Sequence, residues 1–375
     1  MKKFYMLLVA GLIAANAIAQ VTLPPNGGNQ KAKVSQWIGL VEVNIEYHSP
    51  SVHGPNNQDR KGHIWGELVP YGLTNLGFGP ATAGPWRAGA NENTTISFSH
   101  DVQIGGKNLK AGTYGLHLIV EKDKPWTYIF SNNSTSWGSF FYDEKEDALR
   151  VESTPVDAPY TEYLMYGFDD RTVSSATAYL QWENKKAPFK IEVPNVNELY
   201  VATLRDELRG SLGFNNQNVM AAANFCANNK INLEEALTWA DAAISAPFIG
   251  QENFNTLQTK ANVLDAMGKE AEASAVMDRA INHPTANVAQ IHGYGRTLIG
   301  AGKADKALEV FKLNAKLHPE DKFTPNVGLA RGYTAVGDKK NAVKYWEAAI
   351  KNIPENQKPF QSVYEDELAK VKEAK

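Results

Sequence analysis

The chain has 375 residues, of which 43% are apolar, and it carries a formal net charge of −3. That apolar content is enough for two ordinary domains with buried cores. Lysine and arginine number 15 against 19 acidic residues in residues 20–194, and 21 against 22 in residues 195–375. Neither part has the basic excess of a nucleic-acid-binding protein, and no polybasic run suits a membrane surface, so the composition argues against both partner classes.

The first 19 residues have the three parts of a secretory signal peptide. Lys2-Lys3 gives a basic start, Met6–Ile13 is apolar, and Ala17-Ile18-Ala19 is a small-x-small cleavage site before Gln20. The apolar run is too short for a membrane anchor, and no later run reaches the roughly 20 apolar residues that a spanning helix needs. We therefore expect a periplasmic or secreted mature chain with a net charge of −5, which is −3 less two lysines. A leading Gln20 in place of a cysteine predicts that this chain is not a lipoprotein.

Residues 20–34, which include Pro24-Pro25-Asn26-Gly27-Gly28, are typical of a flexible leader. The next segment, residues 35–194, is predicted to form a β domain. The run from Val41 to Tyr47 alternates apolar and polar residues, which is the pattern of a half-buried strand. Gly105-Gly106 follows two short alternating runs and signals a hairpin. Further alternating runs lie at 114–121, 126–130, 149–152, 160–168, 173–182 and 189–193.

These eight or nine short strands are separated by turn residues, with no helical pattern between them. Such a pattern predicts an antiparallel β-sandwich or a barrel-like β domain. Residues 72–85, which are rich in Gly, Pro, Ala and Thr, are predicted to form a long loop within this domain. Long ordered loops on β scaffolds often carry function.

Near Pro194 the apolar period changes to that of helices. Asn197 is suited to cap a helix in a connecting segment at 195–217, and helices are expected from there to the end of the chain. The one cysteine, Cys226, has no partner for an internal disulfide and lies in an alanine-rich helical stretch. We therefore expect a buried small side chain rather than a reactive thiol.

A pattern with a period of about 34 residues recurs in residues 218–375. Gly268, Gly302 and Gly337 are 34 and 35 residues apart. Around them lie tiny residues (Ala261, Gly295, Ala330), alanines (Ala273, Ala307, Ala342), large apolar residues (Met277, Phe311, Trp346) and closing prolines (Pro284, Pro319, Pro354). This pattern resembles tetratricopeptide (TPR) repeats, which implies an α-solenoid of helix pairs whose usual role is to bind another molecule.

Three regular helix pairs are predicted at about 252–283, 285–318 and 323–353. A first, irregular pair is expected at about 218–246, because the spacing from Ala236 to Ala273 is 37 residues. A charged helix from Pro359 to Lys372 is expected to cap the array, since the end units of a solenoid need a polar outer face.

One polar residue per repeat lies six residues before each glycine: Asn262, Arg296 and Arg331. In TPR proteins the first helix of each pair lines a concave groove, and the resemblance implies that this position contacts peptide ligands, sometimes a terminal carboxylate. Arginine forks suit carboxylates through bidentate hydrogen bonds. Three interpretations stay open: a peptide-binding groove, arginines that pair with neighbouring acids such as Asp265 or Glu309 and stay solvated, or a solenoid surface with no high-affinity ligand.

Four segments of the β domain resemble the bacterial domain-of-unknown-function family 2911: Ile64–Gly72, Trp86–Ile96, Ala111–Tyr114 and Asp147–Val151. The resemblance runs from about Ser35 to Phe168. It implies an exported protein with helical repeats behind the β domain, and no activity is established for the family. Residues Leu73–Pro85 are an insertion relative to the family pattern.

The block from Trp86 to Glu92 has two interpretations. Trp86 is suited to stack on a sugar or aromatic ligand, while Arg87, Asn91 and Glu92 supply hydrogen-bond donors and acceptors. Alternatively the block is a structural corner, in which Arg87 and Glu92 form a buried pair, Asn91 caps a turn and Gly89 has an unusual backbone angle. We favour the corner, because such self-satisfied clusters are common in β domains.

No other motif points to catalysis or to a cofactor. His48 and His53 are close in sequence, but the histidines of this domain match no metal motif. Residues 143–147 are acidic but lack the glycine and the alternating ligands of a calcium loop. Glu67 and Glu92 are a formal acid/base pair for glycoside hydrolysis, although any two carboxylates can be paired in this way. We therefore predict no metal and no cofactor.

The sequence thus favours an exported periplasmic binding or scaffold protein, rather than an enzyme, that engages another envelope protein or a peptide through its repeats. The alternative is an enzyme or carbohydrate-binding domain centred on the Trp86–Glu92 block, with the repeats as a tether. No nucleic acid and no membrane span are expected, and nothing in the sequence specifies an oligomeric state.

Overall fold

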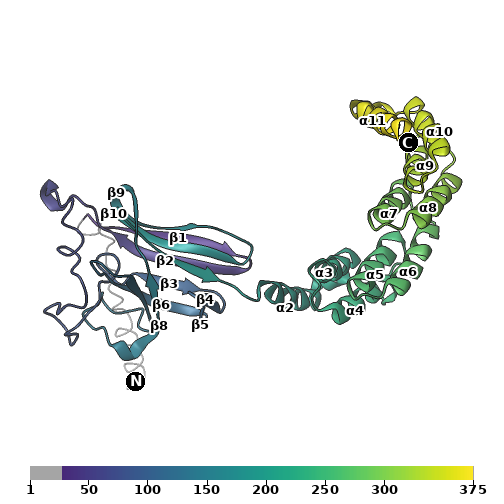
Figure 1. Ribbon diagram of the computed structural model, residues 1–375. Helices are drawn as coiled ribbons and strands as arrows, with labels where there is room; N and C mark the ends of the chain where they lie inside the picture. The colour runs from purple at the N-terminus through teal and green to yellow at the C-terminus, as the bar shows by residue number, and fades with distance from the viewer. Residues whose placement is uncertain (1–27, 375) are drawn as a thin grey trace, which may run out of the picture. The chain divides into compact units, whose positions relative to one another are not determined.

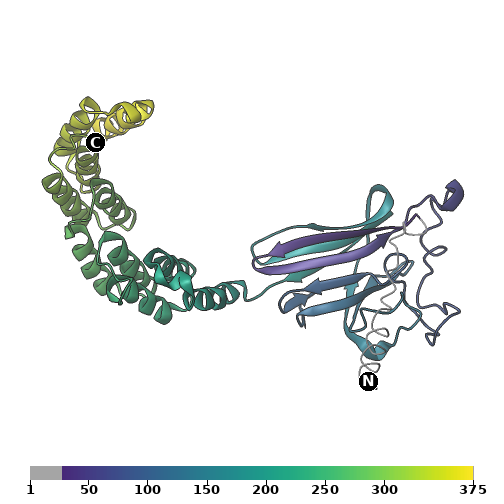
Figure 2. The ribbon, with the colours of Figure 1, turned by 180° about the vertical axis from the view of Figure 1, so that it is seen from behind.

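The computed structural model describes residues 28–374, and the chain divides into two compact units between Val196 and Asn197. Strands make up the first unit and helices the second (Figures 1 and 2). The expected signal peptide at 1–19 lies outside the described residues.

The first unit contains two open antiparallel sheets, and no closed barrel forms within residues 28–374. The six-stranded sheet has the order β1 (Gln30–Ile38), β2 (Val41–Ser49), β3 (Thr95–Phe98), β6 (Gly112–Ile119), β7 (Trp126–Ser131), β8 (Asp147–Ser153). The four-stranded sheet has the order β5 (Lys107–Leu109), β4 (Val102–Ile104), β10 (Ser175–Glu192), β9 (Val156–Asp169). Of the two predicted folds, a β-sandwich and a barrel-like domain, the structure therefore has the sandwich.

The core of this unit lies between the two sheets. Val41, Val43 and Ile45 on β2 are fully buried, as the predicted alternation requires. Across the core, the ring of Tyr128 lies 4.6 Å from that of Phe189, and its hydroxyl donates to the backbone oxygen of Ala187 at 2.8 Å. Side chains from both sheets thus interdigitate, as in a β-sandwich.

Two boundaries differ from the predictions. β1 begins at Gln30 and pairs along its whole length with β2, so residues 30–34 of the expected flexible leader are strand. The runs at 173–182 and 189–193 belong to one 18-residue strand, β10. Glu183 has a φ of 50° at a shift of the β9–β10 register, which lets β10 continue through a bulge instead of ending.

Loops at one end of the sandwich carry the inserted segment. The predicted loop at 72–85 is closed by two backbone hydrogen bonds between Thr74 and Gly84, of 3.0 and 2.8 Å. The predicted hairpin at Gly105-Gly106 joins β4 to β5. Short 3-10 helices lie at η1 (Pro55–Asn57) and η2 (Glu144–Glu146).

The second unit consists of a connecting helix, four helix pairs and a final helix. The helices are α2 (Val196–Leu208), α3 (Asn216–Asn229), α4 (Leu233–Ser245), α5 (Phe254–Ala266), α6 (Glu270–Asn282), α7 (Val288–Gly300), α8 (Ala304–Leu317), α9 (Thr324–Ala335), α10 (Lys339–Lys351) and α11 (Gln361–Glu373). Two 3-10 helices are η3 (Ser211–Phe214) and η4 (Glu355–Phe360). The predicted solenoid is therefore present, although α2 begins at Val196, so Asn197 lies inside the helix instead of capping it.

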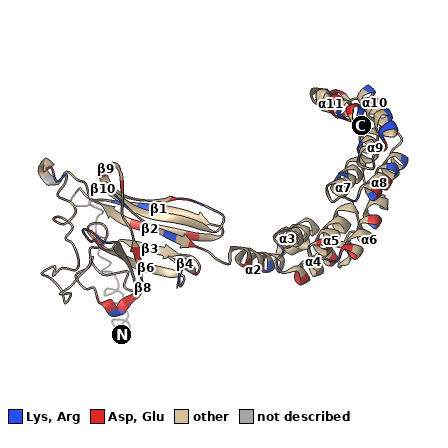
Figure 3. Cartoon of the chain, in the orientation of Figure 1, with Lys and Arg blue, Asp and Glu red and all other residues tan. Residues whose placement is uncertain are grey.

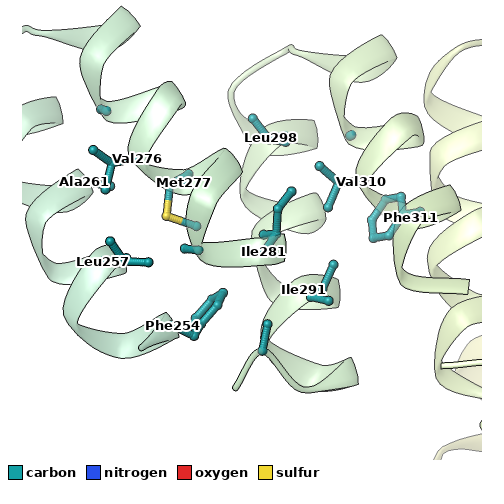
Figure 4. Close-up of a cluster of buried hydrophobic side chains, with 14 of the residues drawn as sticks. Phe254, Leu257, Ala261, Val276, Met277, Ile281, Ile291, Leu298, Val310 and Phe311 are labelled. Atoms are coloured by element: carbon teal, nitrogen blue, oxygen red, sulfur yellow. The ribbon is translucent and has the colours of Figure 1, made fainter. Parts of the chain in front are cut away.

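The repeated small and large residues pack the helix pairs together. Ala261, Gly295 and Ala330 are all buried, as are Met277, Phe311 and Trp346. Figure 4 shows Met277 beside Ala261 and Val276, and Phe311 beyond Val310, in the cluster that joins the central pairs. Cys226 is also buried, and burial raises the pKa of its thiol, which disfavours the reactive thiolate.

Positions of lysine and arginine are interspersed with those of aspartate and glutamate along the described chain (Figure 3). No helix within residues 28–374 combines the length and apolar character needed to cross a membrane.

The three repeat glycines end the first helix of each pair. Gly268, Gly302 and Gly337 have φ values of 75°, 73° and 80°, in the left-handed region. The residue after each glycine donates its backbone N–H to a carbonyl in the last turn of the helix, at 2.9 Å in all three repeats. Glycine takes this conformation without strain, so its recurrence follows from the turn between the helices.

We predict that Gly302→Ala lowers the free energy of unfolding by about 1 kcal/mol, because alanine is strained at positive φ. No atom lies within 4 Å of a Cβ at Gly302, so the cost arises from the backbone alone. Gly293→Ala is the matched control, since Gly293 is an exposed position inside α7 with equally open space. This control is expected to stabilise the array by about 0.5–1 kcal/mol. Urea denaturation followed by far-ultraviolet circular dichroism measures both, and equal effects would contradict the account.

Candidate functional site

Two arginines on successive first helices line one pocket in the solenoid. Arg296 on α7 and Arg331 on α9 border a cavity of about 370 Å³. The other lining residues are Ile299, Thr334, Ala335, Trp346 and Glu367. The pocket thus combines two guanidinium groups with an apolar wall, and a single carboxylate lies at its edge.

Neither arginine of this pocket forms an ion pair with an acidic side chain among the described residues. Neither guanidinium pairs with Asp265 or Glu309, and Glu367 instead accepts a hydrogen bond from Lys370 at 2.7 Å. Burial and the nearby charge of Arg296 lower the pKa of Arg331. The charge of Glu367 acts on Arg331 in the opposite direction, but one carboxylate against two guanidinium groups leaves an excess of positive charge, so the pocket is suited to bind an anion.

The pKa of His292 is lowered by burial and also by the positive charges of the two arginines. Burial lowers its pKa, and the charges of Arg331 and Arg296 lower it further, to about 4. Its Nδ1 atom is buried and has no hydrogen-bond partner among the described residues. The imidazole is thus neutral at pH 7, and the two arginines are the cationic groups of this site.

Asn262, the third predicted groove residue, lies in a neighbouring pocket. This pocket, of about 340 Å³, is bordered by α5, α6, α7 and α8 and includes Gln258, Thr297 and Tyr294. Asn262 donates from Nδ2 to Oδ1 of Asn224 at 3.1 Å. The structure therefore brings Arg296 and Arg331 into one pocket, while Asn262 contributes to a separate one, which charged residues of both signs also line (Asp265, Glu270, Lys303 and Lys306).

Two residues that accompany the predicted positions were missed by the sequence analysis: Asn224 accepts a hydrogen bond from Asn262, and Glu367 lines the arginine pocket. Asn224 on α3 lies 38 residues before Asn262, and Glu367 on α11 lies 36 residues after Arg331. Both distances differ from the spacing of 34 and 35 residues between the predicted positions. No repeat glycine accompanies either residue, and extending the register by 34 or 35 residues leads to positions 227–228 and 365–366, so the repeat pattern held no signal for them.

In the β domain, Trp86 lines a third pocket, of about 510 Å³, together with Trp182. The other three residues of the predicted block have different surroundings. The guanidinium of Arg87 donates to the backbone oxygen of Asn91 and lies 5.0 Å from the ring centre of Phe140. The structure therefore does not gather the block at one site.

The structural corner also differs from its prediction. Glu92 pairs with His48 at 3.0 Å and not with Arg87. Asn91 has a φ of 57° and Ala88 one of 49°, so these residues take the left-handed angles expected of Gly89. Gly89 is required for a different reason: a Cβ there would lie 2.5 Å from the hydroxyl of Thr94.

Two other histidines of the β domain are paired with carboxylates. His53 Nδ1 lies 2.9 Å from Oε2 of Glu162, and His63 Nδ1 lies 2.8 Å from Oε1 of Glu67. The acidic turn at 143–147 is stabilised by the Arg150–Asp147 pair at 2.6 Å. No group of three histidine, cysteine or acidic residues in the described part of the chain is arranged to hold a metal ion.

His117 is a buried histidine that we expect to control the acid stability of the β domain. It is 2% exposed on β6, and its Nδ1 lies 2.9 Å from the hydroxyl of Ser139. Burial lowers its pKa to about 4, and the charge of Arg87 acts in the same direction. The folded domain therefore holds a neutral imidazole that the unfolded chain protonates below about pH 6.5.

The resulting pH dependence has a definite sign. Between pH 6.5 and 4 the unfolded chain binds the additional proton, so stability falls as the pH falls, by up to about 3 kcal/mol. We predict that His117→Gln makes the free energy of unfolding less dependent on pH. Ser139→Ala, which removes only the partner hydroxyl, is expected to leave the pH dependence in place. Tryptophan fluorescence in urea titrations follows this unit, because six of the eight tryptophans lie in it. An unchanged slope in His117→Gln would contradict the assignment.

Comparisons with known proteins give one family match, which covers most of the β domain. Residues 29–191 match the family described as "Protein of unknown function (DUF2911)". No curated protein matches the chain.

Two solved structures are similar to parts of the chain. One is a tetratricopeptide repeat protein from Parabacteroides merdae, with 15% identity, a TM-score of 0.33, and coverage of 47% of this chain and 64% of that one. The chain thus spans less than two thirds of that protein. The other is MamA, from residue 41 to its end, of Desulfovibrio magneticus RS-1, with 17% identity, a TM-score of 0.28, and coverage of 44% and 91%. Residues 29–191 thus match the DUF2911 family, and tetratricopeptide-like helix pairs follow them.

Proposed function

We propose that this protein is an exported binding or scaffold protein, periplasmic or secreted, that engages an envelope protein or a peptide through its helical array. One observation carries the proposal: Arg296 and Arg331 line one pocket, and neither has a carboxylate partner among the described residues. TPR-like arrays are protein-interaction scaffolds, so a protein or peptide is the class of ligand that the fold favours.

The residues that line the pocket favour the C-terminal end of a peptide. Two guanidinium forks are suited to hold one carboxylate by charge-assisted hydrogen bonds. Ile299, Ala335 and Trp346 supply an apolar wall next to them. A peptide end combines a carboxylate with an adjacent side chain, so an apolar C-terminal residue fits this arrangement better than an isolated ion does.

Matched peptide libraries test this function. Hexapeptides of random sequence with a free C-terminal carboxylate are incubated with the immobilised full mature chain, and amidated peptides of the same design serve as the control. Retention of the free-acid library, with enrichment of apolar last residues, is expected. Equal retention of both libraries, or of neither, would overturn the proposal.

Export rests on the signal-peptide pattern and has its own test. Cleavage between Ala19 and Gln20 is expected, and the intact mass of the protein recovered from the periplasm or the medium measures it. A full-length product that keeps Met1 in the cytoplasm would overturn the assignment, irrespective of what the pocket binds.

A second candidate function is a carbohydrate-binding or enzymatic role of the β domain. The observation that favours it is the pocket bordered by Trp86 and Trp182, because aromatic faces in concave sites bind sugar rings. In this case the helical array would tether the β domain to a complex.

A further inference from the structure

The pocket of the β domain has an aromatic base. The rings of Trp86 and Trp182 lie 6.1 Å apart at an angle of 21°, and both border the pocket. They belong to a cluster of four tryptophans, completed by Trp65 and Trp126. Trp182 is almost fully buried, whereas Trp86 is half-buried, so Trp86 presents the accessible aromatic surface.

The indoles that border the pocket are held in place by the backbone. Trp86 donates from Nε1 to the carbonyl oxygen of Gly89 at 3.1 Å. Trp182 donates from Nε1 to the carbonyl oxygen of Glu162 at 3.3 Å. Because both N–H groups are already bonded, the ring of Trp86 is left to make apolar and stacking contacts with a ligand.

Arg60 provides a fixed positive charge in this pocket. It donates from Nε to the carbonyl oxygen of Val52 at 3.1 Å and from Nη2 to that of Ser51 at 2.8 Å. A Cβ at Gly54 would lie 3.0 Å from its Cζ atom, so the glycine makes room for the guanidinium. Among the described residues Arg60 has no carboxylate partner, and no acidic side chain lines the pocket. Its remaining N–H donors are therefore suited to an acidic group of a ligand.

His53, which also lines the pocket, is oriented by Glu162. Its backbone N–H donates to Oε1 of Glu162 at 2.8 Å, and its Nδ1 lies 2.9 Å from Oε2. Burial alone would raise the pKa of Glu162, but hydrogen bonds from Tyr160 and His53 lower it to about 2. Glu162 thus orients the ring of His53, and Nε2, which lies 3.9 Å from Oδ1 of Asp59, is left without a hydrogen bond among the described residues.

We propose that this pocket binds an acidic saccharide, with a sugar ring against Trp86, its carboxylate or phosphate on Arg60, and a hydroxyl hydrogen-bonded to Nε2 of His53. The inference rests on the second candidate function and names its ligand class. The volume of about 510 Å³ lies within the range of small-ligand sites. A neutral sugar would leave the guanidinium without a counter-charge, so the acidic group is the selective feature.

Isothermal titration calorimetry with the full mature chain tests the proposal. The probes are trigalacturonate, its neutral methyl ester, and glucose 6-phosphate, so that a carboxylate is distinguished from a phosphate. Binding of at least one acidic probe is expected, with the ester at least tenfold weaker than trigalacturonate where the carboxylate is preferred. Arg60→Gln is expected to lower the affinity for the acidic probe by about tenfold to a hundredfold, which is the usual effect of losing a charge-assisted contact.

Lys61→Gln is the matched control. Lys61 is adjacent in sequence and lies over the ring of Tyr160 at 5.2 Å, but it does not line the pocket, so its loss is expected to leave affinity unchanged. Equal losses in both variants would indicate general electrostatic attraction and would overturn the assignment of Arg60.

The outcomes also distinguish a failure of the acidic-ligand inference from a failure of the carbohydrate-binding function on which it rests. Equal binding of trigalacturonate and its ester, abolished by Trp86→Ala, would overturn the acidic ligand and leave a saccharide site. Absence of binding by all three probes would overturn the inference. Thermal midpoints of every variant are measured alongside, and Arg60→Lys, which keeps the charge but loses the fork, replaces Arg60→Gln if the latter is unfolded.

Discussion

Phe311→Ala is expected to lower the free energy of unfolding of the helical unit by about 3–5 kcal/mol. Phe311 lies on α8 and is fully buried. A Cβ at Gly295 on α7 would lie 2.4 Å from its ring, and one at Gly328 on α9 would lie 2.5 Å from it. The ring thus fills the space between two neighbouring first helices, and its removal leaves a cavity there.

Urea denaturation monitored by circular dichroism at 222 nm measures this loss, because helices dominate that signal and occur mainly in the second unit. Leu317→Ala is the control: it removes an apolar side chain from the same helix at a position that is 45% exposed. A change below about 0.5 kcal/mol is expected there. If both substitutions cost the same, Phe311 would not have the packing role that its burial indicates.

A double-mutant cycle tests the contact between Phe311 and Gly295. Gly295→Ala alone forces its new Cβ against the ring and is expected to cost about 1–3 kcal/mol. In the Phe311→Ala background the obstacle is absent, and alanine is the better helix former by about 1 kcal/mol. The second substitution is therefore expected to be neutral or stabilising in that background. Additive costs would show that glycine is required at 295 for another reason.

The solenoid was predictable because its determinants repeat along the sequence. A left-handed glycine must end each first helix, and a tiny residue must lie where Phe311 or its equivalent approaches, so the same residue types return every 34 or 35 residues. The alternation in β2 is likewise local, since the pleat places successive side chains on opposite faces.

Features that depend on distant partners were not predictable. Glu92 pairs with His48, 44 positions earlier, and no local pattern distinguishes this partner from Arg87. Trp86 and Trp182 meet across 96 positions of sequence to border one pocket. The bulge at Glu183 lets one strand span what the sequence divides into two runs. In each case the folded topology, rather than the residue type, determines the neighbour.

Replacing both Arg296 and Arg331 by alanine is expected to produce the largest functional effect, a loss of about a hundredfold or more in affinity for a free-acid peptide. A hydrogen bond to a charged group contributes about 1.5–3 kcal/mol, which corresponds to roughly tenfold or more for each arginine. The affinity for the amidated form of the same peptide is expected to change little, because it lacks the carboxylate. Fluorescence anisotropy with a labelled peptide from the retained library measures both.

Arg279→Ala is the matched control for this experiment. Arg279 is also a helix-surface arginine of the array, but it pairs with Glu252 at 2.9 Å and does not line the pocket. Its loss removes one positive charge from the unit, as each of the two pocket substitutions does, so an effect equal to that of a single pocket substitution would indicate long-range attraction instead of a site. Added salt should weaken the wild-type complex as well, since charge pairs near the surface are screened.

A spectroscopic readout distinguishes a direct contact from a structural effect. His292 has a pKa of about 4 because burial and the charges of Arg331 and Arg296 disfavour its protonated form. A carboxylate bound between the arginines offsets their charge, so the pKa of His292 is expected to rise when the free-acid peptide binds and to stay unchanged with the amide. Nuclear magnetic resonance titration of the His292 ring measures this shift. A free-acid peptide that binds without moving this pKa must lie elsewhere on the array, and the arginine pocket would then not be its site.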